Sequence, residues 1–196
     1  MAYYNPTDQL KISENFYKTS LPGLFYFQAK KYNDERGFFS EIVKLSELEQ
    51  AIGKPFPVKQ VNLARSVQNT VRGMHAEGWN KFIFLSSGTA FCAIADVQPD
   101  SPTYKQTEYF KLSFDQETQV GSGLFISQGL ANSVAVLEGP VNYIYLIDRP
   151  YSERNQADER SISIFDPDLK IEWPIAKEDM ILSERDRQAV SLKSLE

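Results

Sequence analysis

Short apolar segments separated by turns are the feature that most constrains the fold of this chain. Seven segments are rich in the Val, Ile, Phe and Tyr residues that favour β-strands, namely 23–32, 38–45, 58–67, 81–97, 106–114, 123–130 and 132–148. Parts of 106–114 and 141–147 alternate apolar and polar residues, which is typical of antiparallel strands with one buried face. The pattern predicts one all-β domain over residues 1–196, a sandwich or jelly roll.

Two segments carry helix signals. In residues 45–53, Ser46 is expected to be the N-cap, Glu49 follows three residues later as in a capping box, and Gly53 marks the end. Residues 182–195 are expected to form a second helix that begins at Ser183. Both segments are short, so we expect them to lie at the periphery of the β-domain.

Composition excludes several classes of protein. The net charge of −5 predicts no bulk attraction to nucleic acids or membrane surfaces, and an anionic ligand would need a local cluster of Arg and Lys. No apolar run approaches the ~18 residues of a membrane span, and the N-terminus lacks a signal-peptide pattern. Cys92 stands alone in an apolar run, where a buried, inert thiol is expected. We therefore expect a cytoplasmic protein.

His75 is the only histidine in the chain. Transition-metal sites usually need two or three His or Cys ligands, so we expect no metal at His75, and the sequence predicts no cofactor. The chain also lacks the nucleophile-elbow, dinucleotide-binding and P-loop motifs. Arg72 lies three residues before His75, so the two side chains leave opposite faces of a strand unless Gly73 allows a bulge. On spacing alone, His75 as a core ring and Arg72 as a surface charge remain an alternative.

Eight segments, in order, resemble the dTDP-4-dehydrorhamnose 3,5-epimerase family of nucleotide-sugar epimerases. The matching segments are 34–41, 60–75, 81–88, 96–103, 129–132, 145–151, 165–174 and 182–186. The resemblance spans about residues 20 to 190 of the chain. It implies a cupin-type double-stranded β-helix, that is a jelly roll with a few short peripheral helices, which assembles as a homodimer.

The resemblance also implies a reaction. The substrate would be a 4-keto-6-deoxy hexose on a nucleoside diphosphate, whose C4 ketone acidifies the hydrogens on C3 and C5. Such an epimerisation needs a base, a group that stabilises the enolate, and an acid on the opposite face. His75 matches the family's base and Asp166 the carboxylate paired with it. Lys81 matches the lysine near the C4 oxygen, and Tyr145 matches the acid.

Further residues match the family's substrate-binding positions. Four residues match family positions that hold the diphosphate and nucleotide. Gln60, Asn62 and Arg72 lie in segment 60–75, and Arg36 lies in segment 34–41. Arginine suits this task because its planar group binds phosphate oxygens in pairs. Phe38, Phe39 and Glu41 match a segment that, in family dimers, reaches the nucleotide bound by the partner subunit.

The chain departs from the family around the sugar. Asn132 stands where the family has a second histidine, and the loop 76–80 is shorter, with Glu77 and Trp79 at positions where the family has Gln. We expect Asn132 and Trp79 to face the sugar and to alter substrate choice. Inversion at C3, at C5 or at both remains open, in a pathway to a surface polysaccharide. A 3,4-ketoisomerase and a non-catalytic nucleotide-sugar binding protein are the alternatives.

Overall fold

The structure is a computed structural model that describes residues 1–114 and 119–195 of the chain. Ten strands are found in these residues: β1 Phe16–Lys18, β2 Leu24–Asp34, β3 Gly37–Ser40, β4 Gln60–Ser66, β5 Val71–Ala76, β6 Lys81–Asp96, β7 Thr107–Phe114, β8 Val120–Ile126, β9 Leu130–Ile147 and β10 Arg160–Ser161. The helices of the same residues are α1 Leu45–Ile52 and α2 Glu184–Arg187, with 3-10 turns at Asp8–Leu10, Tyr151–Glu153, Gln156–Asp158, Lys177–Asp179 and Leu192–Leu195. The prediction of an all-β protein is confirmed.

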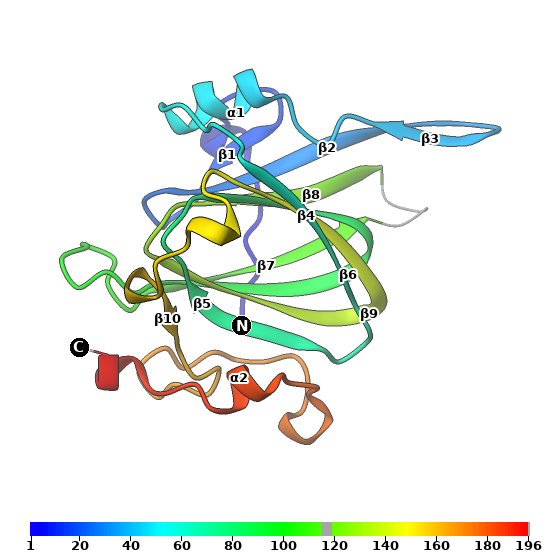
Figure 1. The fold of residues 1–196 in the computed structure, drawn as a ribbon. Coiled ribbons are helices and arrows are strands. Elements are labelled where there is room, and N and C mark those ends of the chain that lie inside the picture. Colours follow the sequence, from blue (N-terminus) through cyan, green and yellow to red (C-terminus); the bar gives the residue numbers. More distant parts are fainter. Residues whose placement is uncertain (115–118, 196) are drawn as a thin grey trace.

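The described strands form a single sheet that curls on itself (Figure 1). Its order is β1-β2-β8-β6-β9-β5-β10, with β3 on β2, β4 on β9 and β7 on β6, and the paired strands are antiparallel. The long strands β6 and β9 pair with each other along most of their lengths. The first half of β9 also pairs with β5 and its second half with β4. Residues from both halves of β9 therefore lie in the same concave region of the sheet.

Two apolar cores flank this sheet. One is rich in phenylalanine and includes Phe27, Phe82 and Phe125. The other lies between the sheet and the C-terminal segment, and includes Phe91 and Ile164. Because the C-terminal half of β6 feeds alternate residues into the two cores, that strand is apolar on both faces, which explains its nearly continuous apolar sequence.

The sequence signals for the two helices predicted the end of α1 and the start of α2, but not the N-cap of α1 or the length of α2. Helix α1 ends at Gly53 in the left-handed conformation, as predicted, but its N-cap is Lys44 rather than Ser46. Glu49 accepts a hydrogen bond from the backbone N–H of Phe56 at 2.8 Å, so it does not close a capping box. Helix α2 begins after Ser183, as predicted, but covers only four residues.

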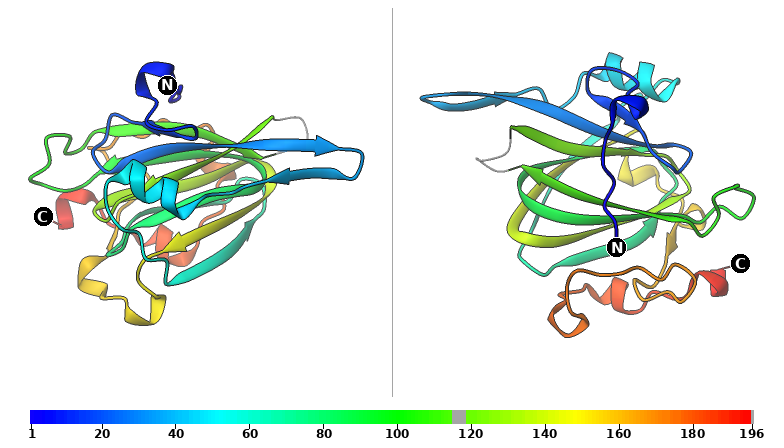
Figure 2. Two further views of the ribbon diagram at one scale, coloured as in Figure 1. Left: turned by 90° about the horizontal axis from the view of Figure 1, so that it is seen from above. Right: turned by 180° about the vertical axis from the view of Figure 1, so that it is seen from behind.

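One predicted strand was half wrong. Segment 38–45 is extended only as far as Ser40, the end of β3, and then runs without regular structure into α1. Its apolar residues Ile42 and Val43 pack against the main core from outside the sheet. Strands β2 and β3 form a hairpin that projects from the body of the molecule (Figure 2).

Strand β5 contains the irregularity that its glycine predicts. Its pairing with β9 shifts between Arg72 and His75, and Gly73 lies between them at φ 124°. A Cβ atom on Gly73 would lie 2.6 Å from the carbonyl oxygen of Asn132, so only glycine fits against β9 here. The bulge turns Arg72 and His75 toward the same cavity.

None of the helices in residues 1–114 and 119–195 is long and apolar enough to span a membrane.

Candidate functional site

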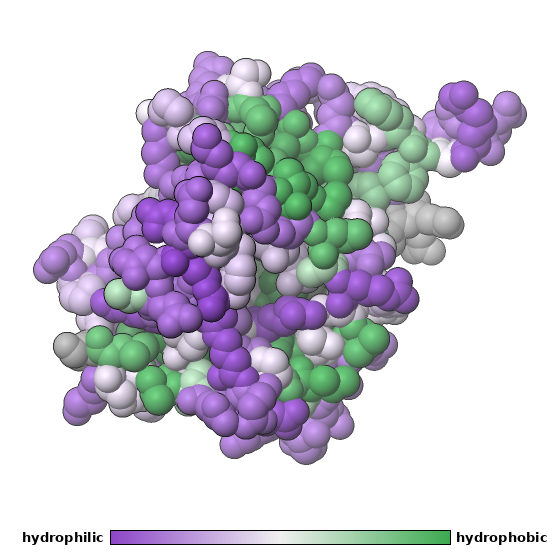
Figure 3. Space-filling view, viewed as in Figure 1, coloured by the Kyte–Doolittle hydropathy of each residue, from purple (hydrophilic) through white to green (hydrophobic). Residues whose placement is uncertain are grey.

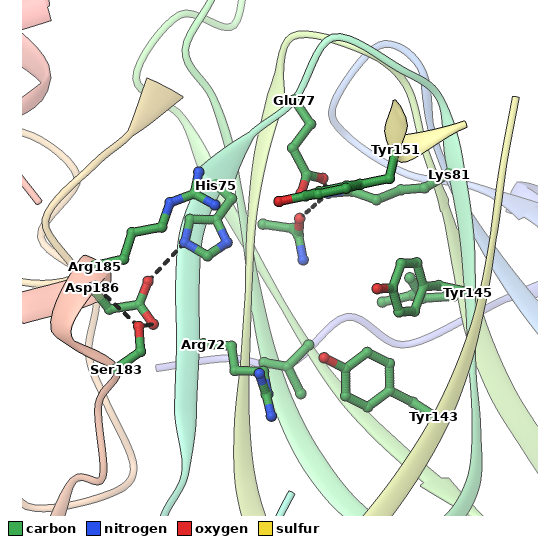
Figure 4. A pocket seen from close by; sticks show the side chains of 13 residues that line it. Arg72, His75, Glu77, Lys81, Tyr143, Tyr145, Tyr151, Ser183, Arg185 and Asp186 are labelled. Atoms are coloured by element: carbon green, nitrogen blue, oxygen red, sulfur yellow. Dashed lines mark hydrogen bonds and ion pairs between the residues drawn. The ribbon is translucent and has the colours of Figure 1, made fainter. Parts of the chain in front are cut away.

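A cavity of about 420 Å³ lies on the concave side of the sheet, between β5, β6, β9 and the segment around α2 (Figure 4). Most of its lining side chains can ionise or form hydrogen bonds. They are Arg72, His75, Glu77, Lys81, Ile83, Asn132, Val134, Tyr143, Tyr145, Tyr151, Ser183, Arg185 and Asp186. Of the residues predicted from the sequence, Arg72, His75, Lys81, Asn132 and Tyr145 meet here.

His75 is paired with a buried carboxylate. Its Nε2 atom lies 2.7 Å from Oδ1 of Asp186, whose side chain is 3% exposed. Burial alone raises the pKa of Asp186, but hydrogen bonds from His75 and Ser183 outweigh burial and lower that pKa overall. An ionised carboxylate can only accept hydrogen bonds, so the Nε2 nitrogen carries the proton and Nδ1 is left as the basic nitrogen. In Figure 4 that second nitrogen faces the cavity.

The predicted partner of His75, Asp166, was wrong. The carboxylate of Asp166 is buried elsewhere and accepts backbone N–H groups from Asp168, Leu169 and Leu192 at 2.9, 3.0 and 2.7 Å. Asp166 therefore fixes a turn and the C-terminal segment rather than the imidazole. Ser183 caps α2 and donates to the carboxylate of Asp186 at 2.7 Å, but this local pattern does not indicate that Asp186 pairs with His75.

Lys81 lies at the back of the cavity and is only 5% exposed. Its ammonium group donates hydrogen bonds to the carboxylate of Glu77 and to the side-chain oxygen of Asn132. A buried ammonium requires such partners, because removing an unpaired charge from water is strongly unfavourable. Glu77 and Asn132 therefore hold the cation at one place in the cavity.

Two tyrosines of β9 line the side of the cavity opposite His75 (Figure 4). Burial raises the pKa of the Tyr143 hydroxyl to about 12. Burial also raises the pKa of Tyr145, and the negative charge of Glu77 raises it further. Both phenols are therefore protonated at neutral pH, and Tyr145 can act as a proton donor.

Two arginines stand at the margin of the cavity near His75. Arg72 donates from Nε to Ser66 Oγ at 2.9 Å, and Arg185 donates from Nε to Ser161 Oγ at the same distance. These bonds orient the two guanidinium groups, and Arg185 also forms an ion pair with Glu159 at 3.5 Å. The N–H groups outside these contacts can bind an anion. Arg185 lay within a matched segment but was not singled out from the sequence.

Two predicted binding residues, Gln60 and Asn62, lie on β4 next to the cavity. Asn62 is paired in register with Tyr145, and Gln60 donates to the Asn62 side-chain oxygen at 2.6 Å. Gln60 also accepts the backbone N–H of Tyr151 at 2.9 Å. The Nδ2 atom of Asn62 is buried and has no hydrogen-bond partner among the described residues.

Trp79, which we predicted to face the sugar, is not among the residues that line the cavity. Its indole ring is buried and packs edge-on against the ring of Tyr151, with centroids 6.3 Å apart. The chain reverses just after it, where the backbone and side chain of Asn80 both donate to Asp148. Trp79 therefore supports a wall of the cavity from behind.

The structure does not bring the hairpin residues to this cavity. Arg36 is 84% exposed at its side chain and forms an ion pair with Asp34 at 2.7 Å. Glu41 is paired with Lys44, and Phe39 is exposed. Within one chain, Arg36, Phe39 and Glu41 have no contact with the site, so their assigned roles remain predictions about a partner subunit.

Comparison with known proteins identifies the class to which this fold and cavity belong. The family model for dTDP-4-dehydrorhamnose 3,5-epimerase matches residues 18–194. A dTDP-4-dehydrorhamnose 3,5-epimerase of Shigella flexneri is 30% identical over 88% of this chain and 92% of its own length. A dTDP-4-dehydro-6-deoxyglucose 3-epimerase of Streptomyces bikiniensis is also 30% identical, over 90% and 88%. Sequence identity thus does not separate double from single epimerases.

Solved structures agree with the sequence comparison. A dTDP-6-deoxy-D-glucose-3,5-epimerase of Legionella pneumophila, solved with dTDP-4-keto-L-rhamnose, superposes with a TM-score of 0.83 at 28% identity, covering 93% of this chain and 94% of that one. A 3'-monoepimerase of Streptomyces bikiniensis, solved with dTDP-quinovose, gives 0.80 at 29%, covering 89% and 86%. The cupin-type jelly-roll prediction is confirmed by these matches. The chain belongs to the dTDP-4-dehydrorhamnose 3,5-epimerase family and is an enzyme of the isomerase class.

Proposed function

We propose that this protein is a cofactor-independent epimerase of a nucleoside-diphosphate 4-keto-6-deoxy hexose, with a dTDP sugar as the first candidate. The observation that carries the proposal is the arrangement of three groups around one cavity. The His75–Asp186 pair and Tyr145 lie on opposite sides, and Lys81 lies between them (Figure 4). A base and an acid on opposite faces of a sugar are what inversion of a carbon centre requires.

In the proposed reaction, Nδ1 of His75 removes the hydrogen from a carbon next to the C4 ketone. The electron pair moves to the C4 oxygen, where the Lys81 ammonium stabilises the enolate. Asp186 stabilises the imidazolium that forms. Tyr145 then delivers its phenolic proton to the opposite face of the same carbon, and the configuration is inverted.

The diphosphate would bind at the margin of the cavity. Arg72 and Arg185 supply two guanidinium groups there. Because the net charge of the chain is −5, these local cations rather than bulk charge would attract the ligand. The unpaired Nδ2 of Asn62, together with Gln60, supports a role for β4 in holding the nucleotide.

We also propose that the chain acts as a homodimer. The space-filling view shows apolar side chains gathered on the upper part of the molecule (Figure 3). Val61 and Leu63 of β4 and Phe38 and Phe39 of the hairpin are exposed apolar residues. Covering them with a second copy would also carry Phe39, Arg36 and Glu41 toward the partner's nucleotide. Light scattering tests this state, and Leu63→Glu is expected to yield monomers.

The decisive experiment incubates the pure protein in D2O with several nucleoside-diphosphate 4-keto sugars and follows C3 and C5 by NMR. Deuterium at both carbons indicates a double epimerase, and deuterium at one indicates a single epimerase. A 3-keto product would instead favour a 3,4-ketoisomerase. Tight nucleotide binding without exchange for any sugar would contradict catalysis and leave a binding protein.

We place the reaction in the cytoplasm, in the supply of a sugar for surface polysaccharide. This part of the proposal follows from the nucleotide-linked substrate that the relatives' names describe. Deleting the gene and analysing the sugars of the cell surface would test it, since loss of the epimerised sugar is expected.

A further inference from the structure

Glu77 contributes a carboxylate to the cavity that the proposed reaction does not use. It follows β5 two residues after His75, and its side chain is 19% exposed. Figure 4 shows this carboxylate at Lys81 and next to Tyr151, between the His75 side and the Tyr145 side of the cavity. This carboxylate therefore lies beside the place that the proposed function gives to the ketone of the substrate.

The hydrogen bonds of Lys81 define that position further. An ammonium group has three N–H donors. Two of them are directed to Glu77 and Asn132. The third is the donor that can meet the C4 oxygen of a substrate, so Glu77 and Asn132 together fix the direction from which Lys81 approaches it.

The substrate offers one hydroxyl beside its ketone. In a 4-keto-6-deoxy hexose, C5 carries the methyl group and the ring oxygen, whereas C3 carries a hydroxyl. An ionised carboxylate has about four acceptor sites, and Lys81 occupies one of those on Glu77. A carboxylate that touches the cation at the C4 oxygen is therefore within reach of a donor on C3.

We propose that Glu77 is a specificity-determining residue, which positions Lys81 at the C4 oxygen and accepts a hydrogen bond from the 3-hydroxyl. The site then takes 4-keto sugars that have a free hydroxyl on C3. This inference rests on the proposed function, because it assumes that Lys81 binds the ketone. A sugar without the 3-hydroxyl leaves a mostly buried carboxylate facing a carbon atom, which is unfavourable.

The experiment compares nucleoside-diphosphate 4-keto-6-deoxyglucose with its 3-deoxy analogue. The readout is kcat/KM for deuterium entry at one carbon, C3 or C5. The carbon chosen is one at which the wild-type enzyme exchanges hydrogen in both sugars. Sites that hydrogen-bond a substrate hydroxyl discriminate strongly against its absence, and for this partly exposed carboxylate we expect a wild-type preference on the order of 100-fold. In Glu77→Ala we expect the preference to fall below about tenfold.

The ratio separates specificity from a general loss of activity. Displacement of Lys81 alone would lower both rates by the same factor and leave the wild-type preference, which would overturn the assignment of Glu77. Glu77→Gln is the matched control, because an amide can still bond a hydroxyl, so its preference should exceed that of Glu77→Ala. A wild-type enzyme that exchanges both sugars equally would also refute the role. No exchange with either sugar would instead overturn the proposed function itself.

Discussion

Replacing Asp186 by Asn tests the pair at the centre of the site. The 2.7 Å bond from His75 Nε2 joins a group that becomes cationic during the reaction to a carboxylate that is almost buried. A hydrogen bond to a charged group contributes about 1.5–3 kcal/mol, and each 1.36 kcal/mol is a factor of ten in rate. Loss of the imidazolium's partner alone therefore lowers kcat by roughly 10-fold to 150-fold.

The tautomer adds to this loss. An Asn amide can donate to Nε2, and the ring proton then moves to Nδ1, the nitrogen that must act as the base. The comparable change in a serine protease costs about 10⁴-fold. We therefore expect Asp186→Asn to reduce kcat for deuterium exchange by about 10² to 10⁴, with nucleotide affinity retained in calorimetry.

Asp166→Asn is the matched control for this experiment. Its carboxylate accepts backbone N–H groups and lies away from the cavity lining, so this variant is expected to melt at a lower temperature but to keep the kcat of its folded fraction. If Asp186→Asn exchanged deuterium within about threefold of the wild type, or if Asp166→Asn lost activity while fully folded, the assignment of the carboxylate would be refuted.

Further predictions address the acid, the bulge and pH. Tyr145→Phe should impair product formation more than hydrogen abstraction, which NMR separates, and unaltered product formation would argue against Tyr145 as the acid. Because burial and Glu77 raise the pKa of Tyr145, the rate should not fall on the alkaline side below about pH 10. Gly73→Ala should lower the free energy of unfolding by about 3 kcal/mol, or the Tm by roughly 6–12 °C. Gly53 also has a positive φ but lies in open space, so Gly53→Ala should lower the free energy of unfolding by about 1 kcal/mol. The lowered pKa of Asp186 stabilises the fold above its unfolded-state value of about 3.9, and this stability is lost as pH falls through the lowered pKa. Asp186→Asn should reduce that acid-side loss in a series of melting curves.

The β-rich fold could be predicted because burial and β-propensity act on local sequence. The same signal failed at Ile42 and Val43, since an apolar run predicts burial but not whether the chain is paired in a sheet. The bulge in β5 was predictable from Gly73, which lies in the chain between Arg72 and His75. The order of the family's motifs predicted His75, Lys81 and Tyr145 as site residues, and all three line the cavity. Asp186 was missed because it pairs with a residue 111 positions away, and no local pattern reports such a contact.

The C-terminal segment contains both Asp166, which was wrongly predicted to pair with His75, and Asp186, which does pair with it. Backbone hydrogen bonds join Met74 of β5 to Ile162 in both directions, and Ser163 to Val190. Asp166 then binds the N–H of Leu192 at 2.7 Å, beyond the helix that carries Asp186. Asp166 therefore helps to hold the segment that delivers Asp186 to His75, although it touches no group in the cavity. A residue in this position stabilises the active arrangement through folding, and for that reason Asp166 variants should alter the melting temperature rather than the chemistry.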